Sequence, residues 1–242
     1  YKMKILALDT SGTNCSVCIL NEEKVICDFN LSTGTTHSQT LLPMIDTIKK
    51  FSNIDLDDID VLACSIGPGS FTGLRIEIAT IKGFALSLNK KVIGVPTLVG
   101  LAYNTSYFDG YVCSVLDAKN NNVYAGIFKY ENGKPILKNN YITDDVSTLI
   151  DILKNKNDKI LFVGDGALAF KERFESSLGD KAFFAPIHLN NQLSSSIAKA
   201  ALDKALLGEF DDYNTLNPLY LKKSQAERML EQDGKLNNNQ DV

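Results

Sequence analysis

The sequence repeats one order of predicted elements twice along its 242 residues. Each half begins with three short strand-like segments joined by turns, over 4–31 and again over 111–140. Placing Asp9 on Asp117 superimposes the first turn of one half on the first turn of the other. Because three antiparallel strands and then alternating helices and strands occur twice in the same order, the repeat restricts the chain to a duplicated α/β architecture.

The rest of each half alternates helices with strands. In the first half, the pattern predicts helices over 37–51, 70–88 and 97–104 and strands over 61–69 and 91–96. In the second half, the matching helices are 144–155, 167–178 and 192–207, and the matching strands are 160–166 and 181–186. The order β-β-β-α-β-α-β-α is that of a ribonuclease-H-like lobe, as in the actin, sugar-kinase and heat-shock ATPase superfamily. We therefore expect mixed sheets flanked by helices.

The repeat also predicts the division into domains. We expect an N-terminal lobe over 1–108 and a C-terminal lobe over 109–216. The tail over 217–242 is expected to contain a helix and a disordered end.

Composition excludes several classes of protein. The chain has 25 Lys and Arg against 29 Asp and Glu, so a net charge of −4 gives no general attraction to a phosphate backbone. No stretch approaches the roughly 18 unbroken apolar residues of a membrane helix. The five cysteines are scattered through apolar runs, unlike the dense even set of a secreted scaffold. We expect a soluble cytoplasmic protein whose partner holds any nucleic acid.

The first turn of each half is where that superfamily holds ATP phosphates, with an Asp followed by small residues. Asp9, Thr10 and Ser11 suit this role and are candidates for weak nucleotide binding, without a tightly bound cofactor. The second half has no glycine in the turn Asp117-Ala118-Lys119-Asn120, so its phosphate site is expected to be lost. An alternative role for Asp9 is that of a structural carboxylate at the end of a buried strand.

A glycine-rich loop lies between a predicted strand and the helix over 70–88. Its residues are Gly67, Pro68, Gly69, Ser70, Gly73 and Arg75. Free N–H groups at a helix start attract anions, but the loop lacks the Lys-Ser/Thr of a phosphate-binding P-loop. The alternative is a structural turn in which Ser70 or Thr72 caps the helix and Arg75 pairs locally.

Histidines are few, which bears on metal chemistry. The chain has His37 and His188, and neither has a second His, Asp or Glu ligand at metal-binding spacing. We expect neither a metal site nor catalytic residues.

The helix over 70–88 has two apolar faces. One holds Leu74, Ile78, Ile81, Ala85 and Leu88, and the opposite one holds Thr72, Ile76, Ala79, Gly83 and Leu86. Either face can pack on the sheet and leave the other for a partner helix. The small residues favour the Ile76 face for the partner, because they allow a second helix to approach closely. We expect a partner interface made of Leu41, Met44, Ile45, Ile48, Thr72, Ile76, Ala79 and Gly83. Alternatively, the helices over 38–51 and 70–88 cover each other.

Several of these segments together resemble one family. They are ILALDTS at 5–11, HSQTLLPMI at 37–45, GPGSFTGLR at 67–75, Lys82-Gly83, GVPTL at 94–98 and PLYL at 218–221. The set closely resembles the bacterial TsaB family, also called YeaZ, over the whole chain and most strongly over 4–103.

That resemblance implies a subunit of the machinery that adds a threonylcarbamoyl group to the adenosine next to the anticodon of tRNAs. In the family, the catalytic, metal-binding paralogue TsaD transfers the group, TsaE supplies an ATPase activity, and TsaB is a non-catalytic scaffold. The resemblance implies TsaD and TsaE as partners, ATP used by the complex, a homodimer when the chain is alone, and tRNA bound only through the complex. His37 stands alone where the catalytic paralogue has a histidine pair. The alternative is a stand-alone ATPase or phosphotransferase of the actin-like superfamily.

Overall fold

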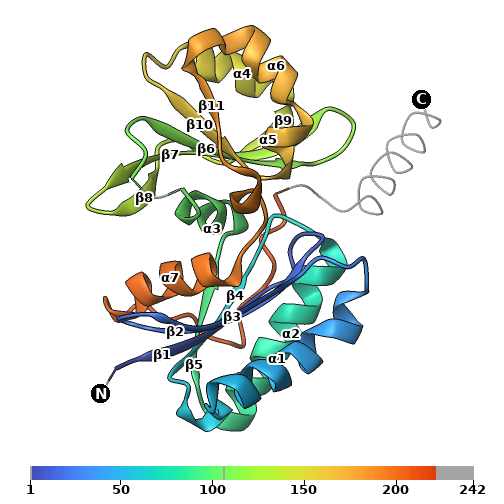
Figure 1. Cartoon of the computed structure of the whole chain (residues 1–242), viewed down its shortest axis with the longest axis vertical. Helices are drawn as coiled ribbons and strands as arrows, with labels where there is room; N and C mark the ends of the chain where they lie inside the picture. The colour runs from blue at the N-terminus through green and yellow to red at the C-terminus, as the bar shows by residue number, and fades with distance from the viewer. Residues whose placement is uncertain (1, 106, 222–242) are drawn as a thin grey trace, which may run out of the picture.

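The computed structural model describes residues 2–105 and 107–221, which form two lobes that each contain one sheet (Figure 1). The first sheet consists of β1 (Lys4–Asp9), β2 (Cys15–Asn21), β3 (Val25–Leu31), β4 (Val61–Ser65) and β5 (Lys91–Val95). Its strand order is β3-β2-β1-β4-β5, with β1 to β3 antiparallel and β4 and β5 parallel to β1. This order confirms the predicted meander and the two crossover strands.

The second sheet repeats this plan. Its strands are β6 (Tyr111–Asp117), β7 (Asn122–Glu131), β8 (Lys134–Leu137), β9 (Ile142–Asp145), β10 (Ile160–Val163) and β11 (Ala182–Phe184). The order is β11-β10-β6-β7-β8, and β9 pairs with the end of β7. The sequence pattern missed β9, because its polar residues Thr143 to Asp145 run directly into a helix.

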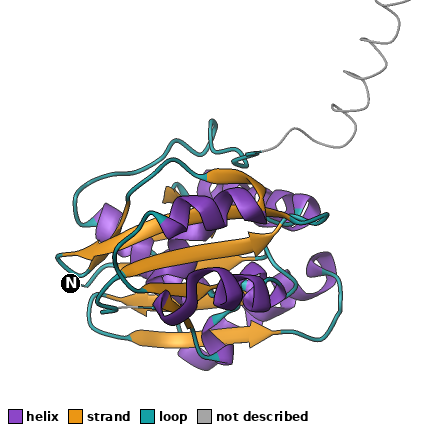
Figure 2. Ribbon diagram, turned by 90° about the horizontal axis from the view of Figure 1, so that it is seen from above, coloured by secondary structure: helices purple, strands orange, loops and turns teal. Residues whose placement is uncertain are grey.

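Helices flank both sheets (Figure 2). The long ones are α1 (His37–Ser52), α2 (Phe71–Leu88), α4 (Val146–Lys154) and α7 (Ser194–Ala205). The shorter ones are α3 (Thr97–Tyr103), α5 (Asp165–Ala169) and α6 (Lys171–Leu178), with 3₁₀ turns at Leu56–Asp58, Gly179–Lys181 and Ile187–Leu189. The predicted helix over 167–178 is thus two helices that meet at Phe170. None of the helices in the described ranges is long and apolar enough to cross a membrane.

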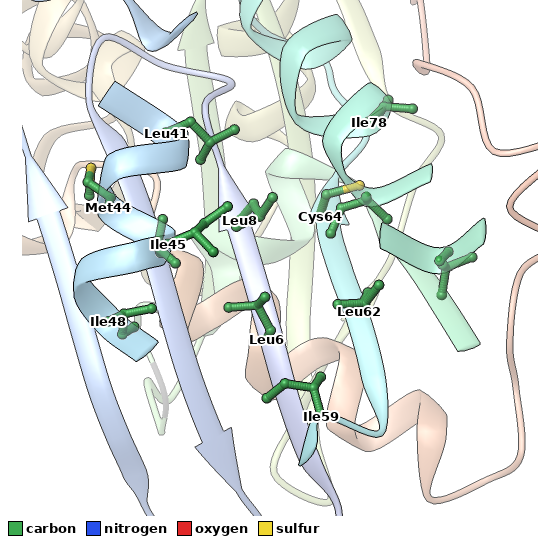
Figure 3. Packing of buried hydrophobic residues seen from close by; sticks show 14 of the residues in the cluster. Leu6, Leu8, Leu41, Met44, Ile45, Ile48, Ile59, Leu62, Cys64 and Ile78 are labelled. Atoms are coloured by element: carbon green, nitrogen blue, oxygen red, sulfur yellow. The ribbon is translucent and has the colours of Figure 1, made fainter. Parts of the chain in front are cut away.

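One face of the first sheet is covered by α1 and α2, which lie side by side (Figure 1). Leu41, Ile45 and Ile48 of α1 point towards Leu6 and Leu8 of β1 (Figure 3). From α2, the predicted docking residues Leu74, Ile78, Ile81 and Ala85 are buried. Burial of these apolar side chains is the main favourable term in holding the helices on the sheet.

The last helix of each half packs across the boundary between the lobes, which corrects the predicted domains. Helix α7 belongs to the second half, yet Ile197, Ala198 and Ala201 are buried against Ile5 and Ala7 of the first sheet. The predicted lobe over 109–216 is therefore wrong for its final helix. The other face of the first sheet is apolar, and the 12 residues of α7 supply its cover.

Helix α3 makes the reverse crossing. It follows β5 of the first sheet, but Leu98, Leu101 and Ala102 lie in one buried cluster with Val112 and Phe128 of the second. Each lobe thus contributes a helix to the core of the other, and α3 and α7 also contact each other. The strands divide at the predicted boundary, whereas the two cores do not.

After α7, the chain returns along the first lobe. Asp211 donates its N–H to the Val92 carbonyl over 2.9 Å, and Leu219 donates its N–H to the Ile66 carbonyl over 2.6 Å. Leu216 is buried in the core beneath α1 and α2. The predicted tail is therefore an ordered part of the first lobe over 217–221, and its predicted helix and disordered end lie outside the described residues.

Candidate functional site

The end of β1 carries a buried carboxyl group, that of Asp9, beneath the turn that follows the strand. Asp9 accepts hydrogen bonds through Oδ1 from the Ser11 N–H, at 2.9 Å, and from the Ser11 hydroxyl, at 2.6 Å. The turn after a strand brings residue 11 back over residue 9, as is typical of an Asp that caps its own turn. The carboxylate thereby fixes the shape of the turn.

A second buried carboxyl group reaches the same turn from α2. Glu77 accepts the Thr10 N–H through Oε2 at 3.0 Å, and its Oε1 accepts the Ser65 hydroxyl at 2.5 Å. The residue is completely buried. Sequence reasoning missed Glu77, although an acid between Leu74 and Ile78 on the docking face was a usable signal, since a buried acid requires donors.

Burial sets the protonation of these two acids. It raises the pKa of Asp9, against the hydrogen bonds from Ser11. It raises the pKa of Glu77 well above the ordinary value, and the neighbouring charge of Asp9 adds to that effect. Two carboxyl groups in one apolar site cannot both ionise cheaply. The pair therefore retains a proton at a pH where an exposed carboxyl group has lost it.

The polar donors of the candidate nucleotide-binding residues point into the protein. The Thr10 N–H goes to Glu77, the Thr10 hydroxyl donates to the Gly73 carbonyl over 2.9 Å, and both Ser11 donors go to Asp9. All four donors of Thr10 and Ser11 thus have acceptors inside the protein. This geometry agrees with the structural alternative for Asp9.

The glycine-rich loop packs α2 directly onto this turn. Ser70 is the helix cap, since its hydroxyl oxygen accepts the Gly73 N–H at 3.2 Å, and its own N–H donates to the Ser11 carbonyl over 2.7 Å. A Cβ at Gly73 would overlap the Thr10 carbonyl oxygen, and one at Gly69 would overlap Ser11. The loop needs glycine at these two positions because backbone meets backbone there.

The ends of the loop attach to other segments. Gly67 has a φ of +106° and is joined to Pro68 by a cis peptide bond. Arg75 donates through Nε to the Tyr220 hydroxyl at 3.1 Å, and its guanidinium lies 3.8 Å from the centre of the Phe71 ring. Arg75 thus makes the expected local contact with Phe71, but its hydrogen bond goes to the distant returning tail instead. The loop residues are structural, as the second interpretation of the motif proposed.

A cavity of about 470 Å³ lies between the two lobes beside this turn. From the first lobe it is lined by Ser11, Gly12, Thr13, His37, Gly69 and Ser70, and from the rest of the chain by Leu116, Asp117, Lys119, Tyr124, Asp165 and Gln192. His37 donates through Nε2 to the Gly12 carbonyl at 3.0 Å, so it serves to join the start of α1 to the turn. Within the described residues, no group of three His, Cys, Asp or Glu side chains is placed to hold a metal ion.

The second lobe presents an acidic wall to this cavity. Burial works against ionisation of Asp117, but hydrogen bonds from Lys119, whose Nζ lies 2.8 Å from Oδ2, outweigh it and lower the pKa. Asp165 accepts N–H groups from Asp117 and Gly166, and burial raises its pKa. The turn there has left-handed φ angles at Lys119, Asn120 and Asn121 without a glycine, because asparagine tolerates this region.

The predicted partner interface is divided by the structure. Leu41, Met44, Ile45 and Ile48 are buried under α1 (Figure 3), so the prediction that they form a partner surface is wrong. Their side chains form the core-facing stripe of an amphipathic helix, which leaves them no surface to offer. On α2, Thr72, Ala79 and Gly83 are exposed and Ile76 is half-buried.

The exposed apolar side chains of this layer extend the α2 surface. Leu86 is 69% exposed and follows the same face of α2, while Leu42 and Phe51 of α1 are 54% and 77% exposed. We define the outer face of α2 as Thr72, Ile76, Ala79, Gly83 and Leu86. A Cβ at Gly83 would meet no atom within 4 Å, so the helix surface is open at that point.

Known proteins share both the sequence and the fold. Residues 32–230 match the family model of TsaD, tRNA N6-adenosine threonylcarbamoyltransferase. The tRNA threonylcarbamoyladenosine biosynthesis protein TsaB of Bacillus subtilis is 31% identical over 228 residues, which is 93% of this chain and 96% of that protein. The Escherichia coli protein of the same description is 40% identical over 134 residues, 54% of this chain and 58% of that one.

Solved structures agree. YeaZ from Pseudomonas aeruginosa matches with a TM-score of 0.77 and 25% identity, over 90% of this chain and all of that one. The ROK hexokinase of Thermus thermophilus matches with a TM-score of 0.51 at 9% identity, over 85% of this chain and 99% of that one. At so low an identity, this match shows a shared fold and nothing more.

The chain is also similar in sequence to a transferase. A tRNA N6-adenosine threonylcarbamoyltransferase of Thermosipho melanesiensis is 30% identical over 116 residues, 42% of this chain and 36% of that one.

Proposed function

The chain belongs to the TsaB family and takes part in tRNA threonylcarbamoyladenosine biosynthesis, and from this premise we propose that it is the non-catalytic scaffold subunit that pairs with TsaD and TsaE. In this proposal TsaD carries the catalytic metal and transfers the threonylcarbamoyl group, and ATP is used by the complex. The complex acts in the cytoplasm and is the form that binds tRNA.

The observation that carries the proposal is the outer face of α2. Ala79 and Gly83 lie one turn apart on an exposed helix surface, flanked by Ile76 and the 69% exposed Leu86. Small residues at this spacing let a second helix come close enough to pack ridges into grooves. A contiguous apolar strip on an otherwise covered layer is typical of a protein interface.

Sequence similarity between this chain and TsaD supports a symmetric geometry for the proposed pairing. The TsaD family model matches residues 32–230, which include α1 and α2, so TsaD is expected to present an equivalent helix layer. Two related layers pack most simply about a pseudo-two-fold axis. The same surface would then pair with a second copy of this chain when the partner is absent, and TsaD would compete for it.

The alternative function, a stand-alone ATPase or phosphotransferase, needs donors for phosphate oxygens. Thr10 and Ser11 use their N–H and hydroxyl groups internally, and Asp117 and Asp165 place acidic groups on the opposite wall. The geometry therefore favours the scaffold.

Reconstitution tests the proposal. The purified chain should co-elute with TsaD, with TsaE joining in the presence of ATP, and omission of the chain should abolish modification of a tRNA transcript. The chain alone should show no appreciable ATP hydrolysis. Hydrolysis by the isolated chain that Asp9→Asn abolishes would instead establish the ATPase alternative.

A further inference from the structure

Lysine side chains gather at one end of the second sheet, where β6, β10 and β11 begin. We call this group the lysine–aromatic patch; it consists of Tyr111, Lys129, Lys156, Lys159, Lys181 and Phe183. Neither the scaffold role nor the cavity between the lobes uses these residues.

Strand pairing brings the patch together. Tyr111 pairs with Lys129 of β7 on one side and with Ile160 of β10 on the other, and Ile160 pairs with Ala182 of β11. Lys159 and Lys181 directly precede Ile160 and Ala182, so they lie in the next row at the same end of the sheet. Neighbouring strands are roughly 4.8 Å apart, so the row spans about 14 Å.

Ring contacts hold the ammonium groups in place. The Nζ atoms of Lys129 and Lys156 lie 5.2 and 5.1 Å from the centre of the Tyr111 ring, and that of Lys159 lies 5.9 Å from the Phe183 ring. A cation over an aromatic ring is attracted by the negative face of the ring. Lys181 donates through Nζ to the Lys156 carbonyl over 2.9 Å. Long side chains that are restrained in this way lose less entropy when they bind an anion.

The charge of the patch is incompletely balanced. Lys129 forms a salt bridge with Asp158 at 3.2 Å, and Asp158 and then Asp109 raise its pKa. Within the described part of the chain, Lys156, Lys159 and Lys181 form no salt bridge. Four lysines of the patch thus stand against Asp109, Asp158, which also interacts with Lys159, and Asp180, so a small positive excess remains on a chain whose net charge is −4.

Aromatic surface accompanies the charge. The Phe183 ring is 40% exposed and lies 6.0 Å from the Phe108 ring, and the adjacent Tyr107 is 88% exposed. Ammonium groups between accessible rings suit a single-stranded nucleic acid, because the lysines contact phosphates and the rings accept unstacked bases. An acidic protein would use the lysines and leave the rings without a role.

We propose that the lysine–aromatic patch is an RNA-contact surface, which holds phosphates of the tRNA while the chain is in its complex. This inference rests on the proposed function, since the complex brings the tRNA. Three lysines without a salt bridge provide few phosphate contacts, so the patch adds to binding by the partner and gives little affinity by itself.

The test compares two variants of equal charge. Lys156→Glu combined with Lys159→Glu reverses two charges in the patch, and Lys24→Glu combined with Lys90→Glu makes the same change on the first lobe. Affinity of the complex for an unmodified tRNA transcript is measured at several salt concentrations, together with the melting temperature and complex formation. The patch variant should bind roughly 10-fold more weakly at low salt. Its salt dependence should be shallower by about 1.4 to 1.8 in log–log slope, as for two lost phosphate contacts.

Kinetics give a second readout. The patch variant should raise KM for tRNA and leave kcat unchanged, and Lys156→Arg with Lys159→Arg should restore binding. Equal loss in both charge-reversal variants, or loss in neither, overturns the proposal. So does loss of binding to anionic phosphatidylglycerol vesicles with unchanged binding to tRNA. If the wild-type chain fails to pair with TsaD, the scaffold proposal falls, and the patch is then judged on the chain alone at low salt with the same variants.

Discussion

Asp9 and Glu77, 68 positions apart in the chain, both contact one hydroxyl group: Ser65 Oγ lies 3.3 Å from Asp9 Oδ1 and 2.5 Å from Glu77 Oε1. The hydroxyl has one proton to donate and two carboxyl oxygens within reach, so a proton retained by the acid pair supplies the second hydrogen bond. Asp9 shapes the turn at the cavity and Glu77 belongs to α2, whose outer face is the proposed partner surface. The inner face of the same helix is thus tied to the turn between the lobes.

Asp9 and Glu77 make the free energy of unfolding depend on pH, and the direction of this dependence can be predicted. Burial raises the pKa of both acids in the folded state, so between the unfolded and folded pKa values the folded chain binds more protons. The free energy of unfolding therefore falls as pH rises through that interval. Glu77→Gln cannot ionise and keeps an acceptor for the Thr10 N–H, so the variant should lose less stability than the wild type as the pH rises above the ordinary carboxyl range.

Urea unfolding followed by circular dichroism at several pH values measures this effect. The exposed Glu209→Gln serves as the control, because it removes a carboxylate of the same type from the surface. Parallel pH curves for wild type and Glu77→Gln would contradict the assignment of a shared proton to this pair.

Substitution by alanine should have opposite effects on stability at two glycines of α2. Gly73→Ala places a Cβ against the Thr10 carbonyl oxygen. This oxygen belongs to the backbone and cannot move aside as a flexible side chain would, so the variant should be destabilised by about 2 kcal/mol or more. Gly83→Ala has open space and a helical backbone, so it should be neutral or stabilise by up to about 1 kcal/mol. Thermal unfolding of both variants decides, and equal effects would mean that α2 does not contact the turn as described.

The sequence predicted the parts of the fold that local pattern determines. Alternating residues and turn residues gave both meanders, and the face of α2 with Leu74, Ile78 and Ile81 was correctly assigned to the sheet. The exchange of α3 and α7 was not predictable in the same way. The apolar face of α7, with Ile197 and Ala201, indicates that the helix packs on an apolar sheet. The pattern does not indicate which of the two sheets it covers.

The site was predictable only in part, for a related reason. Asp9 was identified because it lies within a recognisable strand and turn. The role of Glu77 follows from its hydrogen bonds to Thr10 and Ser65. These residues are distant in the sequence, and no local pattern connects them with Glu77. The wrong prediction that Leu41 belongs to a partner interface has a simpler cause. The apolar stripe of a helix has the same sequence pattern whether it is covered by a sheet of its own chain or by a partner.

The exchanged helix predicts that a change in the second half of the sequence weakens the first lobe. Ala201→Phe overfills the core that α7 shares with β1 and β4, at a cost of about 1–3 kcal/mol. Hydrogen exchange should therefore rise over 4–9 and 61–65. Leu149→Ala in α4, the control, should raise exchange in the second sheet instead. Loss of protection confined to 109–193 in the Ala201 variant would contradict the exchange of helices.

If the outer face of α2 is the partner surface, substitutions on it should abolish assembly without unfolding the chain. Ile76→Glu and Gly83→Leu change the outer face of α2. Gly83 is open, and Ile76 is half-buried at the edge of the core, so both variants should stay folded, with the smaller loss of stability for Gly83→Leu. Each should be a monomer by size-exclusion chromatography with light scattering, because a charge or a large side chain blocks close helix packing. Each should also lose co-elution with TsaD and fail to support tRNA modification.

Leu41→Glu on the neighbouring helix provides the contrast. Leu41 is buried against the sheet, so an unpaired charge there should unfold the first lobe, and loss of assembly would accompany loss of structure. The two sets of variants thus distinguish a surface from a core on adjacent helices. If Ile76→Glu also unfolds, its face belongs to the core. If Ile76→Glu and Gly83→Leu both remain dimeric and active, the partner binds elsewhere, and the small residues of α2 have no role in assembly.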